Sequence, residues 1–161
     1  MHDVGCCRQY QIVLNSKKCI FCALFGVLLG HVVCHDGIFF NPTKIAIILE
    51  LLPPTSITQI RSVLGHTGYY RKFIRGYVAI IAPMEKLLKK DAKFQWTTTC
   101  QESLDKLKKA MATTPILVFP DWKKEFHVHV HASFIVFNIF LKLVGEGALD
   151  HPIAFVSRKY Q

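Results

Sequence analysis

The chain has 161 residues, of which 51% are hydrophobic and 19% are charged, and this supplies enough apolar side chain for one compact domain or two small packed units. Such a composition excludes a disordered chain, because disordered chains are poor in apolar residues. Twenty Lys and Arg against eleven Asp and Glu give a formal net charge of +9, which favours a polyanionic partner.

The positive charge is concentrated in the middle of the chain. Residues 61–124 contain thirteen Lys or Arg and five Asp or Glu, a surplus of +8, whereas residues 1–60 carry +1 and residues 125–161 carry no net charge. A face that binds a polyanion is therefore expected in the middle segment. The alternative is a solvated, lysine-rich surface without a ligand.

The first forty residues alternate short apolar runs with turn residues, which predicts two or three strands. Asp36-Gly37 gives a hairpin signal between two of these runs. The apolar run 20–34 is shorter than the roughly 20 residues of a membrane-spanning helix and contains His31, so we interpret it as a buried strand pair.

The N-terminus lacks the basic segment and apolar stretch that are typical of a secretory signal. We therefore expect the six cysteines to be reduced thiols in an intracellular protein of the cytoplasm or nucleus. The Cys19-x-x-Cys22 pair matches no familiar zinc-finger spacing, and buried free thiols in an apolar strand region are the favoured interpretation.

Helices are predicted next, from capping signals that precede apolar residues at three- and four-residue spacing. These signals are Asn41 before Pro42, Ser56 with Gln59, and Thr98 with Gln101. Gly65 and Gly68 fall within the second helical pattern, where they indicate either a break or a close approach of another backbone.

The strongest pattern in the chain is residues 64–77, LGHTGYYRKFIRGY. It combines two glycines that permit close approach, three tyrosines that can lie against sugars or bases, and the cations Arg71, Lys72 and Arg75 for phosphates. This mixture predicts a helix that lies along a nucleic-acid groove. The alternative is an ordinary amphipathic helix whose tyrosines pack inward.

The C-terminal third is strand-like. Residues 126–131 alternate strictly and place His127, His129 and His131 on one face, and a second strand is expected around residues 135–144. Histidines at this spacing resemble some metal sites, but the sequence locates no third class of ligand. A partly exposed strand face without a metal is therefore the default interpretation.

Six collinear stretches of the chain resemble the C-terminal part of the reverse transcriptase region, running into the RNase H-like domain, of gypsy-type (Ty3-like) long-terminal-repeat retrotransposon polyproteins. They are LNSKKCIF, LLGHVVCHDGI, NPTKIAIILELLPPTSITQIRSVLGHTGYYRKFI, APMEKLLKKDAKFQWTTTCQESLDKLKKAM, TPILVFPDWKKEFHVHVHAS and HPIAFVSRKY.

The resemblance implies an α+β fold in three parts. Residues 1–40 would be a remnant of the reverse transcriptase palm that ends in a short β-hairpin, residues 41–93 the helical thumb and connection, and residues 94–161 a partial RNase H-like domain built on β-strands.

The resemblance also implies functional residues. Leu29, Gly30 and His31 correspond to the palm hairpin that holds the primer terminus, and the thumb helix that follows the template–primer duplex corresponds to Gly65, Gly68, Tyr69, Tyr70, Arg71, Lys72 and Arg75. The implied partner is an RNA–DNA hybrid or a template–primer duplex, and no membrane.

The chain departs from the family at residues that carry chemistry. The first RNase H carboxylate occurs in the family as Asp-Ala-Ser, but His131 stands at its position, and Asn138 replaces a usual glycine. The family uses Mg²⁺, and a neutral imidazole offers that ion one nitrogen and no charge. The later RNase H carboxylates and the polymerase Tyr-x-Asp-Asp segment would lie outside these 161 residues.

No catalytic residue, metal or cofactor is therefore expected in this chain. We interpret it as a catalytically inactive fragment of a reverse transcriptase and RNase H polyprotein with at most residual nucleic-acid binding. The alternative is a domesticated module that binds nucleic acid or protein.

Overall fold

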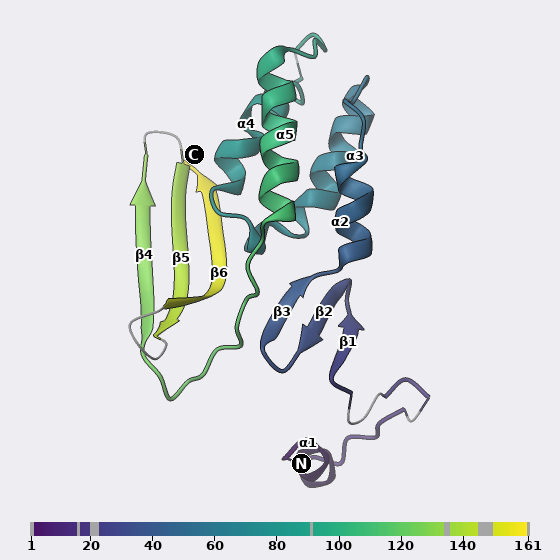
Figure 1. Cartoon of the computed structure of the whole chain (residues 1–161), viewed down its shortest axis with the longest axis vertical. Coiled ribbons are helices and arrows are strands. Elements are labelled where there is room, and N and C mark those ends of the chain that lie inside the picture. Colours follow the sequence, from purple (N-terminus) through teal and green to yellow (C-terminus); the bar gives the residue numbers. More distant parts are fainter. Residues whose placement is uncertain are drawn as a thin grey trace.

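The computed structural model describes residues 2–15, 17–19, 23–90, 92–133, 136–144 and 150–160. Helices α2 to α5 pack together between two small sheets, and this confirms the expected α+β architecture (Figure 1). In chain order the elements are α1 His2–Gln9, β1 Phe25–Leu28, β2 His31–Cys34, β3 Gly37–Phe40, α2 Pro42–Leu49, α3 Ile57–Gly68, the 3-10 helix η1 Arg71–Phe73, α4 Tyr77–Lys86, α5 Thr98–Ala112, β4 Phe126–Ala132, β5 Val136–Val144 and β6 Asp150–Lys159.

The N-terminal sheet is an antiparallel meander in the order β1-β2-β3, so three strands form where two or three were expected. Beyond β3, Leu117 from the segment after α5 forms a single bridge to Ile38, with N–O distances of 2.8 and 2.9 Å. Gly37 permits this approach, since a Cβ there would overlap the Leu117 carbonyl oxygen. The bridge ties the N-terminal sheet to the second half of the chain.

The expectation of a buried strand pair over residues 20–34 is wrong for β1. Phe25 and Val27 are 67% and 63% exposed, whereas Val32 in β2 is buried. The physical reason is that β2 lies between two strands and beside the helices, while β1 is an outer strand with no further strand beside it among the described residues. Of the cysteines, Cys34 is only half-buried, and the second cysteine of the Cys19-x-x-Cys22 pair lies outside the described residues.

The helix starts follow the predicted capping signals in two cases out of three. Asn41 Oδ1 accepts from the Thr43 amide at 3.0 Å, and Ser56 Oγ accepts from the Gln59 amide at 3.3 Å. The third start is shifted by one residue, because Thr97 and not Thr98 caps α5.

The core gathers apolar side chains from β3, all four central helices and η1. Its buried members are Phe40, Ile48, Ile60, Val63, Tyr70, Phe73, Ile74, Tyr77, Ile81, Met84, Cys100, Leu104, Leu107, Met111 and Leu117. The segment between α3 and α4 therefore contributes several closely spaced buried side chains to the core. Within the described residues, no helix combines the length and apolar character needed to cross a membrane.

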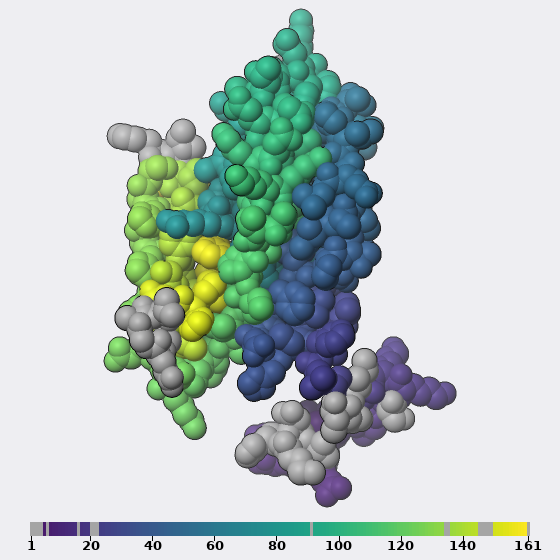
Figure 2. Space-filling view, in the orientation of Figure 1, coloured from purple at the N-terminus to yellow at the C-terminus, as the bar shows by residue number. Residues whose placement is uncertain are grey.

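The C-terminal sheet is antiparallel, in the order β4-β5-β6, with an irregularity in the pairing of β5 with β6 at Leu141/Lys142. The outer strand β6 packs against η1 and α4, and Figure 2 shows the sheet lying against the helices. The contacts include the Arg75 guanidinium 4.4 Å from the centre of the Phe140 ring and the Val78 amide, which donates to Ser157 Oγ at 3.2 Å. Both strands expected over residues 126–131 and 135–144 form, although Ile135 lies outside the described residues.

Candidate functional site

The turn between β1 and β2 is docked onto the segment that follows α3. Tyr69 Oη donates to the Leu29 carbonyl, and Tyr70 Oη donates to the Gly30 carbonyl at 3.1 Å. We call Leu29, Gly30 and His31 the docked turn. The structure thus brings together two groups of residues that the sequence marked separately, forty positions apart.

His31 is enclosed by aromatic rings. Its imidazole stacks on Tyr69, with ring centres 5.1 Å apart and planes 7° from parallel, and it lies edge-on to Tyr70 at 5.4 Å. Burial lowers the pKa of His31, and the nearby positive charge of Lys72 lowers it further. His31 is therefore a neutral packing residue of the docked turn at neutral pH, and its Nδ1 has no hydrogen-bond partner among the described residues.

Two of the three tyrosines expected to lie against sugars or bases are unavailable. Tyr70 is 6% exposed and stacks on Phe40 with ring centres 3.9 Å apart, and Tyr77 is 4% exposed and shares a 3.0 Å hydrogen bond with Thr67. Burial raises the pKa of both phenols. For these two side chains the inward-packing alternative is correct, whereas Tyr69 is 52% exposed.

The two glycines of α3 have different surroundings. The single helix predicted over residues 64–77 does not form, because α3 continues through Gly65 but ends at Gly68, and η1 separates it from α4. At Gly68, Tyr77 Oη lies 3.4 Å from the position of a Cβ, so a side chain and not a backbone makes the close approach. Nothing lies within 4 Å of a Cβ at Gly65. Gly65 lines an open groove of about 410 Å³ between α2 and α3, together with Lys44, Ile47, Ile48, Leu51, His66, Tyr69 and Tyr70.

Three cations converge on a second hollow, between η1 and β6. Arg71 and Lys72 line one side of a pocket of about 580 Å³, and residues 154–158 of β6, which end in Arg158, line the other. We call this the basic pocket. In the part of the chain that the structure describes, none of the three cations has a carboxylate within 4 Å. Sequence analysis missed Arg158, because no local pattern links it to residues 71 and 72.

Arg75 is exposed, but its guanidinium contacts the C-terminal sheet. Its guanidinium covers the Phe140 ring at the junction with the C-terminal sheet, and it is not among the residues that line the basic pocket. The residue expected to contact phosphate therefore helps to hold the sheet against the helices.

His131 lies on the same face of β4 as His127 and His129, opposite Asn138 of β5 and 5.8 Å from the Phe140 ring. Among the described residues, no carboxylates gather around it, and it belongs to no group of three metal-ligating side chains. The donors present do not fit Mg²⁺, which requires several oxygen ligands. No hydrolytic step through that ion follows from this arrangement.

Comparison with known proteins identifies the region. Residues 96–161 match the model of the RNase H-like domain found in reverse transcriptase. The chain is 40% identical over 150 residues to the retrovirus-related Pol polyprotein from transposon 297 of Drosophila melanogaster, an alignment that covers 92% of this chain and 14% of the polyprotein. It is also 36% identical over 125 residues to an uncharacterized mitochondrial protein of Arabidopsis thaliana. That alignment covers 76% of this chain and 78% of the Arabidopsis protein.

Solved structures share the fold. The foamy viral protease-reverse transcriptase in complex with an RNA/DNA hybrid aligns with 90% of this chain and 20% of its own, with a TM-score of 0.73 and 20% sequence identity. The same viral protein in complex with double-stranded DNA aligns with 86% of this chain at the same TM-score. The chain therefore spans a small part of these polyproteins and enzymes.

Proposed function

Because this chain belongs to the reverse transcriptase and RNase H-like region of retrotransposon and retroviral Pol polyproteins, we propose that it binds the backbone of an RNA–DNA hybrid or template–primer duplex. The observation that carries the proposal is the basic pocket, where Arg71, Lys72 and Arg158 meet without carboxylate partners among the described residues. Unpaired cations on a concave surface attract phosphate groups and bind them without reading sequence.

The docked turn supplies the second part of the proposed interface. Its tip is exposed, with Leu29 at 78%, while its carbonyls are held by Tyr69 and Tyr70. A surface held in this way loses little conformational entropy when it meets a ligand. The exposed Tyr69 ring lies beside it and offers a face for a sugar or a base. This arrangement supports the primer-contacting role that the family resemblance implies for Leu29 and Gly30, whereas His31 is only 8% exposed and packs beneath the turn.

Binding without cleavage is part of the proposal. RNase H chemistry needs carboxylates that hold Mg²⁺, and His131 at the expected acid position has none gathered around it in the described residues. We therefore expect no cofactor in this function and no hydrolysis of a hybrid in the presence of Mg²⁺. The finer assignment to the gypsy (Ty3-like) type rests on the six collinear stretches of sequence and stays a proposal.

The test is a salt titration of binding between the purified chain and a labelled RNA–DNA hybrid. We expect the association constant to fall steeply with salt, because each neutralised phosphate releases condensed counterions. Replacing Arg71, Lys72 and Arg158 together with Ala should weaken binding and reduce the slope of log K against log salt by about 2 to 3, close to one for each cation removed from the pocket.

The matched control replaces Lys106, Lys109 and Lys124, three exposed cations on α5 and the following segment, with Ala. It removes the same charge and should leave most of the slope intact. Equal effects of the two triple variants would contradict a local interface and indicate general attraction by a basic protein. If the chain binds no hybrid even at low salt, the interaction-module alternative is favoured, and the groove between α2 and α3 with its exposed Ile47 becomes the surface to examine.

A further inference from the structure

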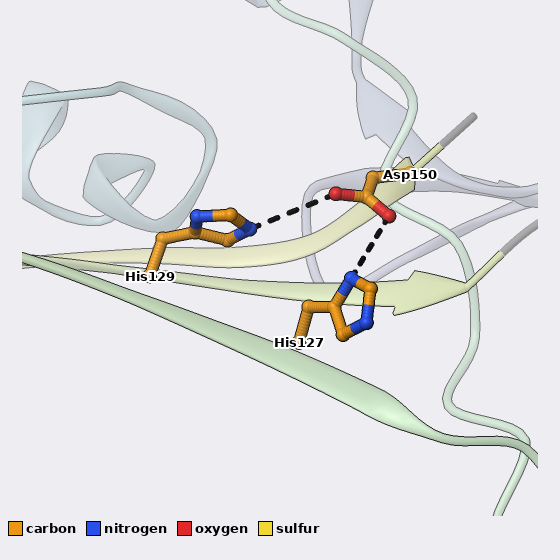
Figure 3. Close-up of side chains that lie close together, drawn as sticks. All are labelled: His127, His129 and Asp150. Atoms are coloured by element: carbon orange, nitrogen blue, oxygen red, sulfur yellow. Dashed lines mark hydrogen bonds and ion pairs between the residues drawn. The ribbon is translucent and has the colours of Figure 1, made fainter. Parts of the chain in front are cut away.

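Three metal-ligating side chains, none of which lines the basic pocket, meet on the C-terminal sheet (Figure 3). His127 Nδ1 lies 3.2 Å from Asp150 Oδ1, and His129 Nε2 lies 3.6 Å from Asp150 Oδ2. The ligand atoms of the three residues all lie within 4.8 Å of one another. The sequence showed the two histidines at period-two spacing but gave no sign of the third ligand.

The sheet register explains how Asp150 reaches histidines two strands away. His127 pairs with Lys142 of β5, and Asp150 at the start of β6 pairs with Val144, two residues further along β5. Side chains two apart on a strand share a face, so Asp150 and the histidines point to the same side of the sheet. Figure 3 shows the two imidazoles on β4 turned toward the carboxylate of β6.

The distances between the histidine nitrogens and the carboxylate oxygens are close to those between two ligands of one metal ion. Imidazole nitrogen and carboxylate oxygen each lie about 2.0 to 2.2 Å from tetrahedral zinc, which places any two ligands about 3.3 to 3.5 Å apart. The two histidine–carboxylate distances of 3.2 and 3.6 Å bracket this value. The two contacts end on different oxygens of Asp150, so the side chains must shift before one oxygen and both nitrogens surround one ion.

One cation already occupies part of this space. Lys142 Nζ lies 3.2 Å from Asp150 Oδ2, and its side chain is 30% exposed. An ammonium group at this point balances the carboxylate charge when no ion is present, and its flexible stem lets it turn away into solvent. Lys142 is therefore a competitor of any metal ion and not a ligand, because a protonated amine has no lone pair to donate.

We propose that His127, His129 and Asp150 form a surface site for one divalent transition-metal ion of the zinc class, whose binding displaces Lys142 from the carboxylate. Two imidazoles and one carboxylate suit zinc and its neighbours and discriminate against Mg²⁺ and Ca²⁺, which take oxygen ligands. The histidines are about half-exposed, so water completes the coordination. A bound ion links the two outer strands β4 and β6 across β5 and stabilises the C-terminal sheet.

The test is a calorimetric titration of the full chain with Zn²⁺. We expect one ion per chain at this site, and at least tenfold weaker affinity in His127→Ala and in Asp150→Asn. Asp150→Asn keeps the shape of the side chain, and the site is on the surface, so both variants should fold. Lys142→Met, which removes the competing ammonium, should instead bind several-fold more tightly. His131→Ala, a histidine of the same strand face outside the group, is the matched control and should bind as the parent does.

Co²⁺ provides a second readout. At a site of nitrogen and oxygen ligands, bound Co²⁺ gives d–d absorption without thiolate-to-metal charge transfer, and this spectrum should disappear in His127→Ala. Charge-transfer bands that survive in this variant would mean that the cysteines bind the ion, and the proposal would be wrong. An affinity that neither His127→Ala nor Asp150→Asn alters would overturn it as well. The proposal does not depend on nucleic-acid binding, because Zn²⁺ is titrated without a nucleic acid.

Discussion

At Leu29 and Gly30 the backbone adopts φ values of 47° and 74°, so both central residues of the β1–β2 turn are left-handed. Two left-handed central residues make a type I′ turn, whose twist matches that of the two flanking strands. Asn-Gly is the preferred sequence for this turn. Gly30 meets the requirement, whereas Leu29 places a Cβ in a region that is sterically unfavourable for it. The turn forms with an unfavourable residue because Tyr69 and Tyr70 hold its two carbonyls.

Leu29→Asn should therefore raise the stability of the chain. Asn tolerates the left-handed region, and the Leu29 side chain is mostly exposed, so little apolar burial is lost. We expect a gain of about 0.5 to 1 kcal/mol in the free energy of unfolding, measured by urea denaturation. Leu28→Asn, at a neighbouring exposed leucine in extended strand, is the control and should give no gain. A decrease in stability at Leu29 would mean that its side chain packs in a way that matters.

His31 gives the chain a pH-dependent stability. Burial depresses the pKa of the folded-state imidazole below its ordinary value of about 6.5, so below that pH the unfolded chain binds more protons than the folded chain. The contribution of neutral His31 to the free energy of unfolding is thus complete above about pH 6.5. It declines as the pH falls from there toward the lower pKa of the folded state. Thermal unfolding at about pH 7.5 and about pH 5.5, on either side of the ordinary value, measures the decline.

His31→Phe should reduce that decline, because the phenyl ring keeps the stacking on Tyr69 and cannot be protonated. The exposed neighbour His35 provides the comparison, and His35→Gln should behave as the parent does at both pH values. If the drop in melting temperature between the two pH values is the same with and without His31, another group causes the decline.

At the scale of elements, two adjacent threonines at the start of α5 have different roles, since Thr97 caps the helix and Thr98 is its first residue. Thr97 Oγ1 accepts from the Cys100 amide, whereas the sequence pattern favoured Thr98 with Gln101. Thr97→Ala should cost about 1 kcal/mol of unfolding free energy, whereas Thr98→Ala should cost nothing, because Ala is the better helix former at a position inside the helix. Urea denaturation of the two variants compares them directly. A larger cost at Thr98 would place the start of the helix one residue later, as the sequence predicted.

This pair also shows what local pattern can and cannot decide. The helices that begin at Asn41 and Ser56, with their caps, and the strands β4 and β5 follow from short-range signals and were predicted, whereas α1 and β6 were not. Which of two adjacent threonines caps the helix is not specified by the local sequence, because both residues can accept the same kind of hydrogen bond. Likewise, whether Tyr70 faces solvent or Phe40 is decided by tertiary packing, which helical spacing alone does not specify.

At the scale of the whole molecule, the two candidate sites are formed by residues far apart in the chain. Arg158 joins Arg71 and Lys72 because β6 packs against η1, and Asp150 joins His127 because the sheet folds back through β5. Neither group of residues could be predicted from a local sequence pattern. The family resemblance pointed to the region of Arg71 and Lys72, but it pointed neither to Arg158 nor to Asp150.

The outer strand of the N-terminal sheet presents exposed apolar side chains and an open edge. Phe25, Val27 and Leu28 are each more than 60% exposed on β1, and its outer edge has no partner strand in the described part of the chain. An exposed, apolar strand edge is a template for pairing with another chain. Concentrated solutions should therefore contain oligomers that grow with protein concentration, measurable by sedimentation velocity.

Val27→Lys should suppress this self-association, because a charge on an edge strand must be desolvated before a second strand can pair with it. Ser62→Lys, which adds the same charge on the exposed surface of α3, is the control and should leave the oligomers unchanged. Equal suppression by both variants would point to a general effect of net charge. If the chain stays monomeric at every concentration, the β1 edge is protected in solution, and the apolar face that it presents must be covered by another part of the chain.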